Sequence, residues 1–397
     1  KPWYVMEHST SAVQWKPLNT RKRAGELMRD SLAHVAMGAD AICFFQWRQS
    51  KSGAEAFHSA MLPHAGADSK VFRGVCELGK ALKTLSDAGL QGTELERAGT
   101  AILFSAESEW ATRSETLPSM KLNHWHDVRD WYRGFLDAGL RADVVPLAYD
   151  WTGYKTIVLP TVLSLSDEDV LRIADFAKAG GTVIVGYAAG LIDEHFHIGL
   201  GGYPGAGNGL LRDMLGIRSE EFNILGEEAE GEPSEISLSN GLTTRLWQND
   251  VTSVAADTTV LASYAGESAA DWELERTPAI TSRPYGNGTA IYVGCDLNRH
   301  DIAQLLKALG SRWRELSAQP TEGGQTPTYP TTDPRILHTI RRSADGSTRF
   351  DFYLNRSNQP VAINGVEGDP IIAHRCETDA VGYTLNRNAI LIAKTSC

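Results

Sequence analysis

The sequence lacks three features that would assign it quickly to a class of protein. It has no run of about 18 apolar residues, which argues against a membrane-spanning helix, and it shows no secretory leader. It also has no dense block of lysine and arginine, and its formal net charge is −11. Nucleic acid and anionic membranes are therefore disfavoured as partners on electrostatic grounds, whereas a small neutral ligand stays open.

Cysteine is scarce and unpaired. The five cysteines lie far apart, with an odd total and no CxxC motif: Cys43, Cys76, Cys295, Cys376 and Cys397. This distribution argues against both a disulfide framework and a zinc site. It favours a reducing compartment, and we expect the protein to be cytoplasmic.

A chain of 397 residues is too long for one ordinary hydrophobic core and predicts two or three domains. The first segment, residues 1–95, alternates strand, helix, strand and helix. The runs "WYVME" and "GADAICFFQWR" are predicted strands, the second of them buried, and residues 21–37 and 71–85 carry the apolar stripes of amphipathic helices. Apolar strands separated by helices are typical of a parallel sheet covered on its faces.

Residues 96–318 form a second α/β block. Its clearest unit is "SDEDVLRIADFAKAGGTVIVGY". There Ser166 is predicted to cap a helix, acidic residues occupy the first turn, and Gly180 and Gly181 end the helix before a buried strand. The repeated alternation of strands and helices predicts a doubly wound domain.

The last part of the chain has a different pattern. Residues 319–335 are rich in Pro, Thr and Gly without periodicity, which predicts a linker. Residues 336–397 hold short strand-like runs separated by turn signals, among them Asp345-Gly346 and Asn364-Gly365. A small antiparallel β domain is predicted there.

The first strand ends on a carboxylate, Glu7. At the carboxyl end of a strand in a parallel barrel, a side chain faces the rim where such barrels keep their active sites. A carboxylate at that place can act as the nucleophile in glycosyl transfer. The structural alternative is an acid that caps the strand or pairs with Arg21 or Arg23, and the strand pattern leaves both interpretations open.

A polar cluster follows the second strand, in "FFQWRQSKSGAEAFHSAMLPHAG". Glu55 and His58 are three residues apart, so one helical turn would place both on the same face, where they could hold adjacent hydroxyls of a sugar. Trp15 and Trp47 offer flat apolar faces for sugar C–H groups. Each residue alone has a structural alternative, but their concentration after both strands favours a site.

Two further patterns point to no chemistry. Glu55, His58 and His64 include the ligand types that zinc uses, but their spacing matches no metal signature, so no metal is predicted. The glycine-rich stretch "VIVGYAAGLIDEHFHIGLGGYPGAGNG" lacks both the Lys-Ser/Thr of a P-loop and a GxGxxG between strand and helix. It predicts a surface loop that carries His195 and His197, for which an interface role stays open.

Three stretches, in their order and spacing, resemble glycoside hydrolase family 42, the β-galactosidases: "VMEHSTSAVQWKPLN", "FFQWRQSKSGAEAFHSAMLPHAG" and the helix "VFRGVCELGKAL". The resemblance covers the whole chain. It implies the C-terminal part of a (β/α)8 barrel, then a doubly wound, glutamine-amidotransferase-like trimerisation domain, then a small antiparallel β domain. It also implies a retaining, cofactor-free hydrolysis of terminal non-reducing β-D-galactose residues by a homotrimer.

Carried over residue by residue, the resemblance implies that Glu7 is the nucleophile at the end of the seventh barrel strand. It further implies that Trp15 lines the sugar site and that Glu55 and His58 bind galactose hydroxyls; we add Trp47 to the candidate substrate-binding residues. The family's acid/base, from an Asn-Glu pair on the fourth strand, has no counterpart, because strands one to six are not in this sequence. We therefore expect this polypeptide to be inactive alone.

The middle domain resembles class I glutamine amidotransferases in fold only. Those enzymes need a cysteine at a strand-to-helix elbow, where "VGYAAG" here offers Tyr187, Ala188 and Ala189. Amidotransfer is not predicted, and an oligomerisation role is, since a fold does not by itself supply a function. A rival hypothesis treats the doubly wound and β domains as a non-catalytic assembly or binding module.

Overall fold

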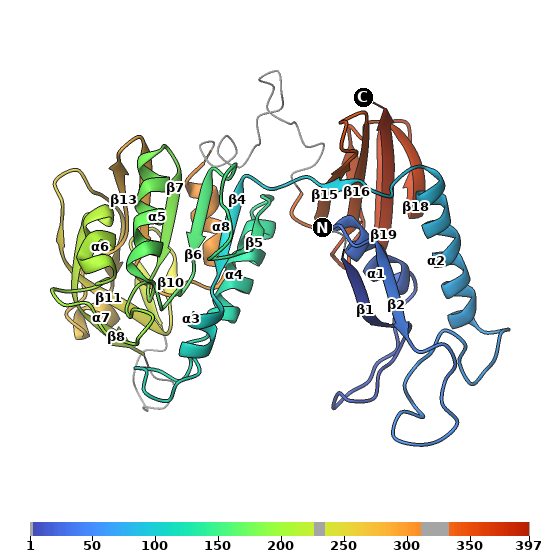
Figure 1. The fold of residues 1–397 in the computed structure, drawn as a ribbon, viewed down its shortest axis with the longest axis horizontal. Coiled ribbons are helices and arrows are strands. Elements are labelled where there is room, and N and C mark those ends of the chain that lie inside the picture. Colours follow the sequence, from blue (N-terminus) through green and yellow to red (C-terminus); the bar gives the residue numbers. More distant parts are fainter. Residues whose placement is uncertain (1–2, 226–234, 311–332, 397) are drawn as a thin grey trace. The chain divides into compact units, whose positions relative to one another are not determined.

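The computed structural model describes residues 3–225, 235–310 and 333–396. Contacts divide the chain into two compact units (Figure 1). The first unit is made of residues 1–96 together with 328–397, and the second of residues 97–327. The predicted linker lies outside the described residues up to position 332. Within the described ranges, no helix has the length and apolar character needed to cross a membrane.

The first unit joins two β/α units to a six-stranded antiparallel sheet. Strands β1 and β2 pair in parallel, each followed by a helix, as the sequence predicts. The sheet has the order β17-β19-β16-β15-β3, with β18 paired to β19. The elements are β1 (Tyr4–Ser9), α1 (Glu26–Ala36), β2 (Ala41–Phe45), α2 (Lys70–Asp87), β3 (Glu94–Leu95), β15 (Ile336–Arg342), β16 (Thr348–Asn355), β17 (Val361–Asn364), β18 (Asp369–Thr378) and β19 (Gly382–Ser396).

Residues 1–96, here called the barrel segment after the resemblance, and the C-terminal sheet share one hydrophobic core. Helices α1 and α2 lie against the sheet (Figure 1), α1 on β15, β16 and β19 and α2 on β18. The buried residues of this core are Met28, Leu32, Val35, Ala36, Leu78, Ala81, Leu85, Leu90, Phe350, Phe352, Leu354, Ile390 and Ile392. The sequence predicts residues 1–95 and 336–397 as separate domains, whereas in the structure both contribute side chains to this one core.

Strand β2 is half-exposed, so the prediction of a buried second strand is wrong for the described structure. A strand buried on both faces needs neighbours on both edges and layers above and below it, whereas β2 pairs only with β1 among the described strands. Strands β3 and β18, which complete the sheet, were not predicted. The turn glycines Gly346 and Gly365 do adopt the positive φ that their turns require.

The second unit is built on a nine-stranded sheet of order β10-β9-β12-β13-β14-β7-β6-β4-β5. The strands from β14 to β5 are parallel, which confirms the doubly wound prediction for that half. The other half is antiparallel and was not predicted. The nine strands of the whole sheet are β4 (Thr100–Phe104), β5 (Asp143–Pro146), β6 (Thr156–Leu159), β7 (Thr182–Gly186), β9 (Ile236–Leu238), β10 (Thr243–Thr244), β12 (Thr259–Ala265), β13 (Pro278–Tyr285) and β14 (Gly288–Val293). Strands β8 (Ile217–Ile224) and β11 (Trp247–Val254) form a separate antiparallel pair.

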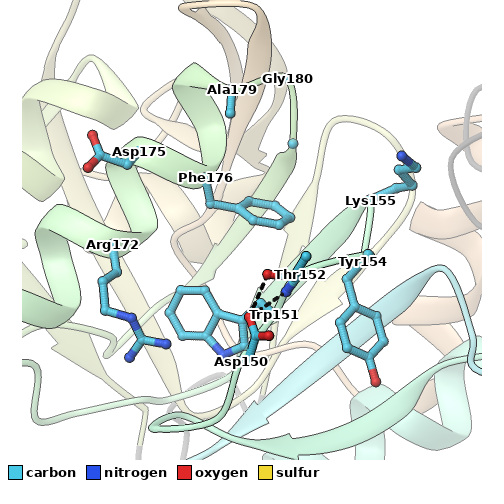
Figure 2. A pocket seen from close by; sticks show the side chains of 12 residues that line it. Asp150, Trp151, Thr152, Tyr154, Lys155, Arg172, Asp175, Phe176, Ala179 and Gly180 are labelled. Carbon is cyan, nitrogen blue, oxygen red and sulfur yellow. Dashed lines mark hydrogen bonds between the residues drawn. The ribbon is translucent and has the colours of Figure 1, made fainter.

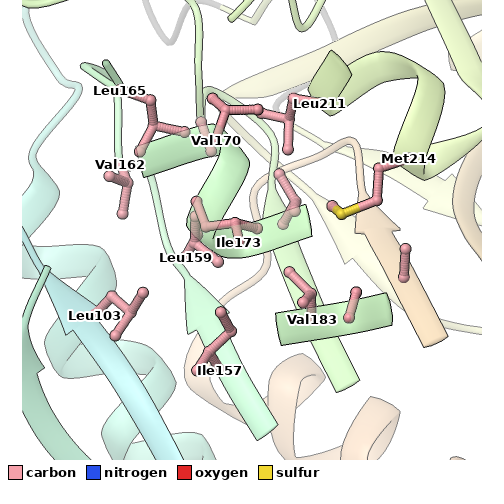
Figure 3. Close-up of a cluster of buried hydrophobic side chains, with 14 of the residues drawn as sticks. Leu103, Ile157, Leu159, Val162, Leu165, Val170, Ile173, Val183, Leu211 and Met214 are labelled. Atoms are coloured by element: carbon pink, nitrogen blue, oxygen red, sulfur yellow. The ribbon is translucent and has the colours of Figure 1, made fainter. Parts of the chain in front are cut away.

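Helices cover both faces of the parallel strands. Alternate strand residues point to opposite faces, so Ile157 and Leu159 pack under α5 and α6 (Figure 3), whereas Val158 packs under α4 and α8. The helices of this unit are α3 (Ala106–Ala111), α4 (His124–Asp137), α5 (Asp167–Lys178), the 3-10 turn η1 (Gly207–Gly209), α6 (Leu210–Leu215), α7 (Glu267–Asp271) and α8 (Arg299–Ala308).

The start of α5 confirms the predicted helix signal. Ser166 accepts a hydrogen bond from the Asp169 N–H at 3.1 Å, and the Asp169 carboxylate accepts one from the Ser166 N–H, which is a complete capping box. The helix ends before Gly180, whose φ of +114° suits only glycine. Strand β7 follows directly and is buried along its whole length.

Candidate active site

Glu7 lies in a β-bulge near the end of β1. Val5 pairs with Ile42 and His8 pairs with Phe44, so Met6 and Glu7 together lie opposite a single residue of β2. A bulge leaves one residue outside the regular pairing and turns its side chain, a device that is frequent beside active sites. The Glu7 carboxylate is exposed.

The residue after Glu7 is held neutral. The His8 ring lies 5.4 Å from His34 and 5.5 Å from Phe44, measured between ring centroids. Burial lowers the pKa of His8 to about 4, with further lowering from Lys22 and His34, whereas Asp30 acts in the opposite direction. At neutral pH the imidazole beside Glu7 therefore carries no charge, and it packs against His34 and Phe44.

The loop after β1 is tied to the loop after β2 by Ser59. Its hydroxyl accepts hydrogen bonds from the Thr10 hydroxyl at 3.2 Å and from the Ser11 N–H at 2.9 Å. Its own N–H donates to the Ala12 carbonyl at 2.9 Å. These bonds fix the backbone three to five residues after Glu7 against the second loop. No spacing rule in the sequence marked Ser59 for this role.

Gln14 adds a second tie between the same loops. Its amide donates to the Ala54 carbonyl, and its side-chain oxygen accepts from the Phe57 N–H at 3.1 Å. The loop after β1 and the loop after β2, here called the rim loops, are therefore joined by several hydrogen bonds. The predicted site residues that follow the two strands lie on these joined loops.

Trp15 and His58 are stacked on each other. Their ring centroids are 4.8 Å apart at an interplanar angle of 24°, with the indole 60% exposed and the imidazole 0% exposed. His58 Nδ1 lies 2.8 Å from the Ser59 carbonyl, and because a carbonyl only accepts, Nδ1 carries the proton. Nε2 is then a buried acceptor, and it has no partner among the described residues.

Glu55 and His58 do not share one helical face, so that prediction is wrong. Residues 51–58 form turns rather than a helix, and the His58 N–H donates to the Glu55 carbonyl at 3.0 Å. A single turn does not repeat the angular step of an α-helix, so the Glu55 side chain is exposed while His58 is buried.

The remaining predicted residues lie farther along the same loop. Trp47 lies two residues after the end of β2, next to Gln46, and its side chain is 65% exposed. His64 Nε2 lies 2.6 Å from the Ser50 carbonyl and is occupied by that contact. In the described part of the chain, no three His, Cys, Asp or Glu side chains gather in a way that could hold a metal.

The middle domain buries a separate polar cluster at the carboxyl ends of β6 and β7. The Asp127 carboxylate accepts hydrogen bonds from the Tyr187 hydroxyl at 2.6 Å and from the Thr161 hydroxyl. Burial raises the pKa of Asp127 to about 7, with smaller contributions from the nearby charges of Asp296 and Asp130 and opposing ones from the two hydroxyls. Tyr187 stands at the elbow and is engaged as a hydrogen-bond donor.

A depression of about 470 Å³ opens elsewhere on this domain, between the loop before β6 and the end of α5 (Figure 2). The Arg172 guanidinium lies 4.1 Å from the Trp151 ring centroid, and Phe176 meets the same indole edge-on at 6.5 Å. Asp150 accepts from the N–H and hydroxyl of Thr152. Its main aromatic and charged groups are thus engaged with one another.

Only the middle of the glycine-rich stretch is the exposed loop that the sequence predicts. Residues 183–192 are buried and begin within strand β7, and the exposed part starts at residue 194. Asp193 organises its start by accepting from the His195 and His197 N–H groups, each at 2.8 Å. These bonds, led by the one from His197, keep the pKa of Asp193 below its usual range. Both histidines are therefore residues of an ordered surface turn.

Three family models match consecutive parts of the chain. They are described as beta-galactosidase for residues 1–85, beta-galactosidase trimerisation domain for residues 98–317 and beta-galactosidase C-terminal domain for residues 336–395. The resemblance to glycoside hydrolase family 42 is confirmed, and the chain belongs to this family. Its first segment is the C-terminal part of a (β/α)8 barrel.

Similar proteins agree with this assignment. Beta-galactosidase BbgII of Bifidobacterium bifidum is 43% identical over 396 residues, which cover 99% of this chain and 54% of that protein. A beta-galactosidase of Arthrobacter is 37% identical, covering 94% and 49%. The structure of Gan42B, a GH42 beta-galactosidase from G. stearothermophilus, superposes with a TM-score of 0.84 at 26% identity, covering 100% and 54%. The chain spans about half the length of the curated relatives it matches.

Proposed function

We propose that the protein to which this chain belongs hydrolyses terminal non-reducing β-D-galactosyl residues with retention, and that Glu7 is the nucleophile. The observation that carries the proposal is the exposed Glu7 carboxylate at a bulge of a barrel strand, beside a loop surface that presents Trp15. The names of its relatives support galactose as the sugar. No cofactor enters the reaction.

In a retaining glycosidase, two carboxyl groups lie about 5 to 5.5 Å apart. Glu7 attacks the anomeric carbon and forms a covalent galactosyl ester, while the second group protonates the leaving oxygen and later deprotonates water. We place this acid/base on a barrel strand outside the 397 residues. Because acid/base assistance is worth about 10² to 10⁴-fold, the chain alone is proposed to be inactive.

The sugar is held by the loop surface. Trp15 and Trp47 pack on the C–H groups of the ring, and Glu55 accepts hydrogen bonds from hydroxyls. His58 Nε2 is a buried acceptor without a partner among the described residues, which suits a galactose hydroxyl. The Trp15 indole is stacked on that imidazole, so the two side chains present one recognition surface to the sugar.

Assembly and location complete the proposal. The family model matched by residues 98–317 supports a homotrimer joined through the middle domain. The spread of the cysteines supports a cytoplasmic protein.

The test uses the full-length protein with Glu7→Gln and, as a matched control, Glu77→Gln on the exposed side of α2. Glu7→Gln is expected to lower kcat on an aryl β-galactoside by at least roughly 10³-fold with an unchanged circular dichroism spectrum. The Glu77 variant is expected to match the wild type. Normal turnover by Glu7→Gln would refute the assignment.

A further inference from the structure

A buried arginine of the C-terminal sheet holds the barrel segment in place. Arg341 on β15 is 2% exposed. Its Nη1 donates to the carbonyls of Val35 at 3.0 Å and Ala39 at 3.2 Å, and its Nη2 and Nε donate to the carbonyl and hydroxyl of Thr93 at 2.8 and 3.0 Å. One guanidinium thus joins the end of α1, the turn into β2 and the segment after α2.

The contacts add donors to the carbonyl end of α1, where the Val35 carbonyl also accepts from the Gly38 N–H at 3.0 Å. The last carbonyls of a helix lack partners within the helix, and a cation near them also meets the negative end of the helix dipole. On the same face of β15, the Thr339 hydroxyl donates to the Ala36 carbonyl at 2.8 Å. Two neighbouring carbonyls at the end of α1 are therefore bound from the C-terminal sheet.

The turn that Arg341 holds is joined directly to β1. Asp40, whose carboxylate lies 3.5 Å from Arg341 Nη2, donates its N–H to the Trp3 carbonyl at 2.9 Å. From there β1 and β2 pair in register, beginning at Tyr4 with Ala41 and reaching the bulge that presents Glu7. A continuous set of hydrogen bonds therefore leads from the C-terminal sheet to the nucleophile strand.

We propose that Arg341 is a positioning residue: by fixing the turn between α1 and β2 it sets the β1–β2 register and hence the place of the Glu7 carboxylate. The C-terminal sheet then acts on the reaction without touching the substrate. The inference rests on the proposed function of Glu7. A lysine cannot replace the arginine, because a single ammonium does not reproduce the planar fork that reaches α1 and Thr93 together.

The test compares full-length variants at a temperature well below the lowest Tm. The variants are Arg341→Met and Arg341→Lys, and the readout is kcat/KM on aryl β-galactosides whose leaving groups range from poor to activated. A displaced nucleophile slows attack on every substrate, so Arg341→Met is expected to lose about 10 to 100-fold equally across the series, the scale of a shift of about 1 Å. Arg341→Lys is expected to show a smaller uniform loss.

Two controls separate position from stability. Arg342→Met removes the ion pair of Arg342 with Glu96, 2.7 Å long, on the opposite face of the same strand. Leu391→Ala opens a cavity in the core on the sheet face turned away from α1. Both are expected to keep wild-type kcat/KM, even where Leu391→Ala has the lower Tm.

The outcomes are distinct. If Arg341→Met lowers Tm but keeps kcat/KM, the arginine is merely structural and the inference fails, as it does if only poor leaving groups are affected. If Arg341→Met does not fold, Arg341→Lys and Thr339→Val decide in the same way. A wild-type protein without β-galactosidase activity would instead overturn the proposed function.

Discussion

The indole of Trp15 lies flat against the imidazole of His58, with 4.8 Å between ring centroids, although one ring follows β1 and the other follows β2. The stack leaves the outer face of the indole open beside Glu7's loop and hides the histidine. Trp15 is therefore the side chain of this pair that a sugar meets first.

Removal of this indole tests the sugar platform. Trp15→Ala is expected to raise KM for an aryl β-galactoside by about tenfold and to change kcat much less, because the platform binds ground state and transition state alike. Trp15→Phe should recover most of the affinity. Trp110→Ala, which removes an exposed indole of α3, serves as control; an unchanged KM in Trp15→Ala would contradict the assignment.

The tie between the rim loops has a measurable stability. Ser59→Ala leaves the Ser11 N–H without its acceptor, and it is expected to lower the free energy of unfolding by about 1 to 2 kcal/mol. Urea unfolding of the full-length protein measures the change against Ser52→Ala, an exposed serine of the same loop. Equal midpoints for the two variants would show that the tie is not formed.

His8 makes the barrel segment sensitive to acid. Its folded pKa of about 4 lies below the ordinary value of 6.5, so its contribution to stability is present above pH 6.5 and is lost as pH falls toward 4. His8→Phe is expected to lose less free energy of unfolding between pH 7 and pH 4.5 than the wild type does. His126→Phe, at an exposed position of α4, should keep the wild-type pH dependence; identical slopes for all three proteins would refute the account.

Asp127 is expected to give stability the opposite dependence on pH. Its folded pKa of about 7 lies above the ordinary value of 3.8, so its contribution is complete below pH 3.8 and is lost as pH rises through 7. Asp127→Asn mimics the protonated acid, and at about 1.4 kcal/mol for each pKa unit it is expected to raise the free energy of unfolding at pH 8 by roughly 2 to 4 kcal/mol. At pH 4 the variant and wild type should agree. A destabilised variant at pH 8 would show that the ionised carboxylate is the favoured form.

Local signals in the sequence were reliable where a few neighbouring residues decide the structure. The capping box of Ser166 and the stop at Gly180 depend on contacts within one helix and one turn. The parallel pairing of β1 and β2 likewise follows from their apolar runs and the intervening helix. Such features need no knowledge of the rest of the chain.

Relationships between distant segments could not be predicted. Arg341 meets Val35 across 306 positions, and nothing in the periodicity of β15 indicates that its arginine points into a core. The pairing of β3 with β15 could not be predicted for the same reason, because the two strands lie far apart in the sequence. The prediction that Glu55 and His58 share one face was wrong for a local reason, since a three-residue spacing implies a shared face only where the backbone is helical.

The most direct test of Glu7 is to identify the residue that carries the covalent galactosyl intermediate. The full-length protein is incubated with an activated 2-deoxy-2-fluoro-β-D-galactoside, which slows hydrolysis of the ester, and the labelled peptide is sequenced by mass spectrometry. We expect one sugar per active site, attached to Glu7, and no label in Glu7→Gln. A label on Glu55 or on any other carboxylate would contradict it.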